Sequence, residues 1–258
     1  MTWHRYVAIG DSTTEGLDDP DGRGGYRGWA DRLAEHLARV QGGLAYANLA
    51  IRGKLTRQIR DDQLAVALDL RPDLATAVAG MNDLIRPSLD IVSVISDIET
   101  MHSVLIDAGA TVVTFTLPFP GPGMPIATLL RPRIRRFNRA LRASAKRTGA
   151  LVLDLETNAV ASDPRLWSED RLHANSAGHA RIAAGLAATL GLPGADHRWA
   201  EPLPALAPQP LRKAIAADLS WARSHLGPWI GQRIRGESSG DDLKPKRPAL
   251  LPVVVGSD

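Results

Sequence analysis

The sequence predicts a three-layer α/β/α sandwich built on a parallel β-sheet. Two observations favour this fold class. Short apolar runs alternate with longer amphipathic segments over the first two-thirds of the 258 residues, a repetition typical of βαβ units with right-handed crossovers. The short runs are apolar throughout rather than at every second position, as expected for parallel strands that helices cover on both faces.

Five of the apolar runs are expected to be the strands of the sheet. They are residues 6–10, 44–50, 74–80, 111–117 and 151–156. Each run is short and bounded by turn-forming or polar residues, which is typical of a buried strand. The predicted sheet therefore has five parallel strands.

Amphipathic helices are expected between these strands. In three of them, apolar side chains recur at helical spacing and so share one face. The three stripes are Trp29, Leu33, Leu37 and Val40; Ile91, Ile95, Ile98 and Leu105; and Leu130, Ile134, Phe137 and Leu141. A fourth helix is expected at residues 177–190, with Asn175 or Ser176 as its N-cap and Gly191 as its C-terminal stop.

The sandwich is expected to span residues 1–191. The rest of the chain differs in composition, since it holds nine of the 18 prolines. Residues 192–235 are expected to form an appendage that packs on the sandwich, with one amphipathic helix. Its apolar face would comprise Leu211, Ile215, Leu219, Ala222 and Leu226. Residues 236–258 have little apolar periodicity and are expected to form a mobile tail.

Composition excludes several classes of protein. The chain has no cysteine, which rules out disulfide scaffolds, zinc–thiolate sites and a cysteine nucleophile. No run of about 18 apolar residues is present, so no transmembrane helix is expected. The N-terminal residues lack the apolar core of a signal peptide, and a cytoplasmic location is expected. The oligomeric state is left open.

The first candidate functional residue is Ser12, which directly follows the first predicted strand in Gly10-Asp11-Ser12. Sites in open α/β sheets gather at the carboxyl ends of strands, where a nucleophile would be placed. Thr14 stands where the G-x-S-x-G elbow has its second glycine, so the α/β-hydrolase pattern is not met. The structural alternative is a turn in which a serine or threonine caps the next helix.

A serine hydroxyl needs a base to take its proton, and His173 is the candidate base. Asp170 precedes it by three residues, in a predicted loop before the last helix of the sandwich. That spacing lets the carboxylate bind Nδ1–H of the imidazole and leaves Nε2 free to face a serine. The structural alternative is a helix entry with exposed charges.

Two further segments follow the second and third predicted strands. Gly53 permits a tight turn with an exposed backbone N–H, and Asn82 presents a side-chain amide directly after a buried strand. Acyl transfer develops an oxyanion, which fixed neutral donors of this kind stabilise. The structural alternatives are an ordinary turn glycine and a helix N-cap.

These four segments, taken in order, resemble the SGNH (GDSL-type) hydrolase family. Gly-Asp-Ser ends the first strand, a glycine follows the second, Gly-x-Asn-Asp follows the third, and Asp-x-x-His lies near the end of the sandwich. The resemblance covers about residues 5–190 and implies a flavodoxin-like sandwich of five parallel strands. One position departs from the pattern, because Thr13 stands where the family name implies leucine.

The resemblance also implies roles for individual residues. Ser12 would be the nucleophile, His173 the general base and then acid, and Asp170 the residue that orients the imidazole. The Ser12 N–H, the Gly53 N–H and the Asn82 amide would form the oxyanion hole. Asp11 and Asp83 would hold the surrounding loops. The family implies a small-molecule ester substrate and neither a metal nor an organic cofactor.

Several functions fit these residues. The first is a serine esterase, and an acyltransferase or a carbohydrate deacetylase would need the same groups. A different class is a non-catalytic protein that binds nucleic acid or another anion through the basic helix at 131–147. The apolar stripe on that helix favours a solvated basic face instead, so nucleic acid is not the expected partner.

Overall fold

The computed structural model describes residues 1–119, 127–205, 240 and 243–254. Its strands are β1 (Arg5–Gly10), β2 (Ala45–Asn48), β3 (Leu74–Val78), β4 (Thr111–Phe115), β5 (Leu151–Leu153) and β6 (Arg247–Pro252). Its α-helices are α1 (Ser12–Glu15), α2 (Gly28–Gln41), α3 (Thr56–Asp69), α4 (Met81–Leu84), α5 (Ile91–Asp107), α6 (Ala127–Thr148) and α7 (Ser176–Thr189). Three short 3-10 helices are η1 (Ala159–Ser162), η2 (Pro164–Leu166) and η3 (Arg198–Ala200).

The strands form one sheet in the order β5-β4-β3-β1-β2-β6. The first five are parallel, in the doubly wound order whose topological switch point lies between β1 and β3. Because β2, β1 and β3 are adjacent and parallel, their carboxyl ends lie side by side at the same end of the sheet. The predicted fold class and all five predicted strands are confirmed.

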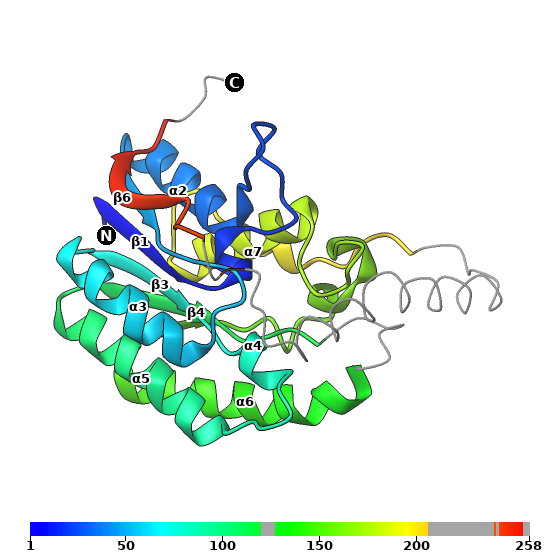
Figure 1. Ribbon diagram of the computed structural model, residues 1–258. Helices are drawn as coiled ribbons and strands as arrows, with labels where there is room; N and C mark the ends of the chain where they lie inside the picture. The colour runs from blue at the N-terminus through cyan, green and yellow to red at the C-terminus, as the bar shows by residue number, and fades with distance from the viewer. Residues whose placement is uncertain (120–126, 206–239, 241–242, 255–258) are drawn as a thin grey trace.

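Helices cover both faces of the sheet (Figure 1), with α3, α5 and α6 on one side and α2 and α7 on the other. Alternate side chains of β1 enter the two apolar cores. Val7 and Ile9 lie in the core beneath α3 and α5. Tyr6 and Ala8 lie in the core beneath α2 and α7, where the fully buried Trp29 also packs. Burial on both faces explains why the strands are apolar throughout.

The sixth strand differs from expectation. Part of the expected mobile tail forms β6, which pairs antiparallel with β2. Its side chains are mostly exposed, and Leu250 packs partly buried against one apolar core. The strand is held mainly by backbone hydrogen bonds to β2, and Arg247 Nε adds a hydrogen bond to Tyr46 O at 2.7 Å. The prolines in β6 suit an edge strand.

Lys246, directly before β6, ties this strand to the segment at the start of α2. Its Nζ lies 2.9 Å from Asp31 Oδ2, and it donates to the carbonyls of Tyr26 and Arg27 at 2.9 and 2.8 Å. The ammonium group thus has three oxygen partners that lie far from it in the sequence. The C-terminal strand is therefore attached to the sandwich through polar contacts.

The rest of the C-terminal region is described in part. Residues 192–205 include η3, and Arg181 Nη1 on α7 donates to Trp199 O at 2.6 Å. The expected amphipathic helix, with its face from Leu211 to Leu226, lies outside the described residues. The division into a sandwich, an appendage and a tail stays a prediction, apart from the strand β6.

Candidate active site

Ser12 is the first residue of α1, directly after β1. Asp11 caps this short helix, and its Oδ1 accepts a hydrogen bond from Thr13 N at 3.1 Å. Gly10 is held from both sides by Gln63, whose amide binds the Gly10 N–H at 2.8 Å and the Gly10 carbonyl at 2.9 Å. A Cβ at position 10 would lie 2.3 Å from Thr14 Oγ1. The turn that presents Ser12 therefore requires glycine there.

His173 lies on a closed loop before α7. Trp167 and Ala174 form a β-bridge at its base, and Ser168 N donates to His173 O at 2.9 Å. The Asn175 amide binds the carbonyl of Trp167 at 3.1 Å while its oxygen caps α7. The loop is thus fixed at both ends, and it carries Asp170 and His173 to the carboxyl end of β1.

The structure brings Ser12, His173 and Asp170 together in one hydrogen-bonded triad. His173 Nε2 lies 2.9 Å from Ser12 Oγ, and His173 Nδ1 lies 2.6 Å from Asp170 Oδ2. Asp170 Oδ1 accepts hydrogen bonds from Ser168 Oγ, Leu172 N and His173 N, at 2.5, 2.9 and 3.0 Å. A serine, an imidazole and a carboxylate in this order form the arrangement of a nucleophile, its base and the residue that orients the base.

The charges in the triad favour one protonation state. Burial by itself would raise the pKa of Asp170, but the hydrogen bond and charge of His173 outweigh it and hold that pKa well below its usual range. Asp170 is therefore an acceptor, and His173 Nδ1 carries the proton that it accepts. Burial would likewise lower the pKa of His173, but the hydrogen bond and charge of Asp170 raise it above its usual value.

Asn82, on α4, lies at the same carboxyl end of the sheet as Ser12. Its Nδ2 donates to Asp11 Oδ2 at 3.2 Å and to Lys54 O at 3.1 Å. Gly80, before α4, has a φ of +113°, and a Cβ there would lie 2.5 Å from Phe137 Cζ. The turn therefore needs glycine both for its backbone and for its packing. It places the Asn82 amide beside the residue that precedes Ser12.

The third group expected in an oxyanion hole is the Gly53 N–H. Gly53 lies in a turn after β2 with a φ of +78°. Within the described residues, neither the Gly53 N–H nor the Ser12 N–H has a hydrogen-bond acceptor. Asp83 secures this loop, since its Oδ2 binds Thr56 N at 3.0 Å and Thr56 Oγ1 at 2.8 Å at the start of α3.

Comparison with known proteins identifies the family. Residues 8–181 match the model of the GDSL-like lipase/acylhydrolase family. The chain belongs to this family. As a member, it is a GDSL-type ester hydrolase. No curated protein sequence matches the chain.

Solved structures show the same fold. Axe2, an acetylxylan esterase from Geobacillus stearothermophilus, has a TM-score of 0.63 at 17% identity, covering 78% of this chain and 97% of Axe2. TesA has a TM-score of 0.59 at 20% identity, covering 72% and 98% of the two chains. LAE5, an α/β hydrolase enzyme from the metagenome of Lake Arreo, Spain, has a TM-score of 0.58 at 22% identity, covering 73% and 95%.

One pair in this GDSL-type hydrolase was not found from the sequence. The buried Glu15 accepts from Arg52 N at 2.9 Å and from Arg52 Nε at 3.1 Å, and it also binds Arg52 Nη2. The guanidinium lies 5.1 Å from the centre of the Tyr26 ring. The pair ties α1 to the residue before Gly53. Both residues lie within residues 8–181, which match the family model, but nothing in the sequence indicates that they are in contact.

The basic residues of α6 include some with polar partners in the sandwich and some that are exposed. Arg133 Nη1 donates to Leu84 O at 2.9 Å, Arg142 pairs with Asp154 and Glu156, and Arg147 pairs with Glu99. The exposed arginines are Arg131, Arg135, Arg136, Arg139 and Arg147. Arg131 and Arg135 lie over the Phe119 ring, at 4.9 and 5.4 Å. Polar contacts within the described residues therefore account for three of the eight basic side chains from Arg131 to Arg147.

One group of side chains in the described residues could reach a metal ion: Asp18, Asp170 and His173. Both ring nitrogens of His173 are already engaged, with Ser12 and Asp170. The geometry therefore favours the hydrogen-bonded triad at this place. Among the residues that the structure describes, no helix is long and apolar enough to cross a membrane.

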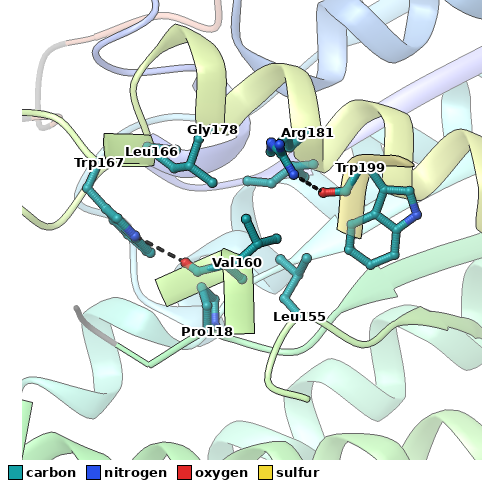
Figure 2. A pocket seen from close by; sticks show the side chains of 11 residues that line it. Pro118, Leu155, Val160, Leu166, Trp167, Gly178, Arg181 and Trp199 are labelled. Carbon is teal, nitrogen blue, oxygen red and sulfur yellow. Dashed lines mark hydrogen bonds between the residues drawn. The ribbon is translucent and has the colours of Figure 1, made fainter. Parts of the chain in front are cut away.

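A small apolar cavity lies beside the His173 loop (Figure 2). Trp167, which closes that loop, forms one wall and donates from Nε1 to Ala161 O at 3.1 Å. Leu155, Val160 and Trp199 form other walls. A Cβ on Gly178, at the start of α7, would lie 2.2 Å from Leu166 O. The 3-10 helix η2 and α7 thus pack too closely at Gly178 for any larger residue.

Proposed function

We propose that this GDSL-type hydrolase cleaves carboxylic esters through an acyl-enzyme on Ser12. The observation that carries the proposal is the hydrogen bonding from Ser12 Oγ to His173 Nε2 and from His173 Nδ1 to Asp170, at 2.9 and 2.6 Å. Because Asp170 accepts the Nδ1 proton, the neutral imidazole has its lone pair on Nε2. It can then take the hydroxyl proton of Ser12.

The first half of the reaction forms the acyl-enzyme. Ser12 Oγ attacks the ester carbonyl carbon while its proton passes to His173 Nε2. The carbonyl oxygen becomes an oxyanion, which the Ser12 N–H and the Gly53 N–H would stabilise. The Asn82 amide would join them by exchanging one of its two present acceptors, Asp11 Oδ2 or Lys54 O, for the oxyanion. The intermediate then expels the alcohol oxygen, which takes the proton from Nε2. Asp170 stays ionised and stabilises the imidazolium between these steps.

The second half releases the acid. A water molecule attacks the acyl carbon while His173 Nε2 accepts its proton, and a second oxyanion forms in the same hole. Collapse breaks the bond to Ser12 Oγ, which recovers the proton from Nε2. If an alcohol replaces water, the same groups transfer the acyl group. An acyltransferase or a carbohydrate deacetylase therefore stays the second candidate, and the acetylxylan esterase activity in the name of Axe2 suggests acetylated sugars as a test substrate.

The experiment is a comparison of Ser12→Ala with the wild type on p-nitrophenyl esters of increasing acyl length. We expect kcat to fall by about 10⁴-fold or more in the variant, with the fold retained. Near-wild-type turnover would remove Ser12 from the mechanism. Salt-sensitive DNA binding without ester turnover would support the non-catalytic alternative instead. A cytoplasmic location stays a prediction.

A further inference from the structure

A second carboxylate lies beside the imidazole of the triad. Asp18 Oδ2 is 3.9 Å from His173 Nδ1, the nitrogen that also lies 2.6 Å from Asp170 Oδ2. The longer distance exceeds that of a hydrogen bond. Asp18 therefore acts on the ring through its charge, while Asp170 acts through both its charge and a hydrogen bond.

The backbone at Asp18 is held in an uncommon conformation. Its φ of +67° lies in the left-handed region, which residues other than glycine rarely adopt, although aspartate and asparagine tolerate it best. Such a conformation costs free energy and persists only where the surrounding structure holds it. The contacts of the two neighbouring residues show what holds it here.

Leu17, before Asp18, is fixed by a buried histidine. His179 Nε2 donates to Leu17 O at 3.1 Å, and Trp29 N donates to His179 Nδ1 at 3.1 Å. Burial lowers the pKa of His179 to about 4, so the ring is neutral near pH 7 and each nitrogen has one role. His179 thus ties the Asp18 loop to α7 and to α2.

Asp19, after Asp18, is fixed by a buried ion pair. Its carboxylate accepts hydrogen bonds from Arg32 Nε at 2.8 Å, Arg32 Nη2 at 2.9 Å and Gly28 N at 3.0 Å. Both neighbours of Asp18 are therefore bound to the helices that flank the loop. These contacts hold the strained residue with its carboxylate toward His173.

We propose that Asp18 is a positioning residue that stabilises the His173 imidazolium formed when Ser12 gives up its proton. The inference rests on the proposed function. The titratable groups that face His173 are Asp170 on its own loop, Asp18 on the loop before α2, Asp11 at the end of β1 and His179 on α7. With water-like screening, the loss of a unit charge about 4 Å from the imidazolium should lower the rate about five-fold.

The test is the pH profile of kcat/KM for Asp18→Asn, which removes the charge but keeps the size and the tolerance of positive φ. We expect kcat/KM on the neutral plateau to fall about five-fold. The midpoint of the acid limb should move to lower pH, because removing a negative charge lowers the pKa of His173. The loss should therefore shrink as the pH falls. Asp69→Asn, on the exposed end of α3, is the charge-matched control and should leave the profile unchanged.

A second variant separates charge from backbone strain. Asp18→Gly also removes the carboxylate but adopts positive φ freely, so it should shift the profile as Asp18→Asn does. An unchanged profile, or an equal loss at every pH with an unmoved midpoint, would overturn the inference. If the wild type has no turnover that depends on Ser12, the proposed function fails. If it has such turnover and only the Asp18 profiles are unchanged, the inference about Asp18 alone fails.

Discussion

Replacing Asp170 with asparagine should disable the triad while leaving the loop folded. Three donors point at Asp170 Oδ1, namely Ser168 Oγ, Leu172 N and His173 N. In the variant, the amide oxygen should keep these bonds, which turns the amide nitrogen toward His173 Nδ1. An N–H facing Nδ1 favours the tautomer with its proton on Nε2, which cannot accept the Ser12 proton. We expect kcat to fall by about 10⁴-fold.

The assay is the turnover of p-nitrophenyl acetate, with a thermal melt to check folding. Asp163→Asn is a matched control, because Asp163, like Asp170, accepts a hydrogen bond from the backbone N–H two residues later, that of Arg165 at 3.0 Å. It should keep most of the activity. A folded Asp170→Asn enzyme within about ten-fold of the wild-type kcat would refute the reasoning about the tautomer.

Three further outcomes are expected. Asn82→Ala should lower kcat by about 10²–10³-fold with little change in KM, because the amide would act on the developing oxyanion; a rise in KM alone would contradict that role. The kcat/KM of the wild type should increase with pH through the raised pKa of His173, since the base must be neutral, and a flat profile would count against it. Removing residues 243–258 should lower the melting temperature by about 5–10 °C, because the deletion exposes the β2 edge; an unchanged melt would show that β6 adds no stability.

The sequence predicts the strands for local reasons, whereas it assigns the triad through the resemblance to the GDSL-type family. Strands covered on both faces are apolar throughout, so the pattern alone locates them. Asp170 and His173 are close in sequence, and Ser12 directly follows a strand, at the carboxyl end of the sheet where sites in such folds lie. Each prediction depends on short segments and on the topology that joins them.

The remaining features depend on contacts between distant segments. Glu15 and Arg52 are 37 residues apart, and neither residue type indicates the other as its partner. Asp18 approaches His173 only because Leu17 and Asp19 are bound to two helices. The strand β6 is held mainly by backbone pairing and by the contacts of Lys246 and Arg247, and most of its side chains are exposed, so hydrophobic periodicity does not reveal it.

The most direct test of the acyl-enzyme mechanism is stoichiometric labelling with a fluorophosphonate, followed by peptide mapping. The account predicts one label for each chain, on Ser12, with esterase activity lost in proportion to labelling. His173→Ala should label far more slowly, because the hydroxyl then lacks its base. A label on another residue, or full activity in the Ser12-labelled enzyme, would contradict the mechanism.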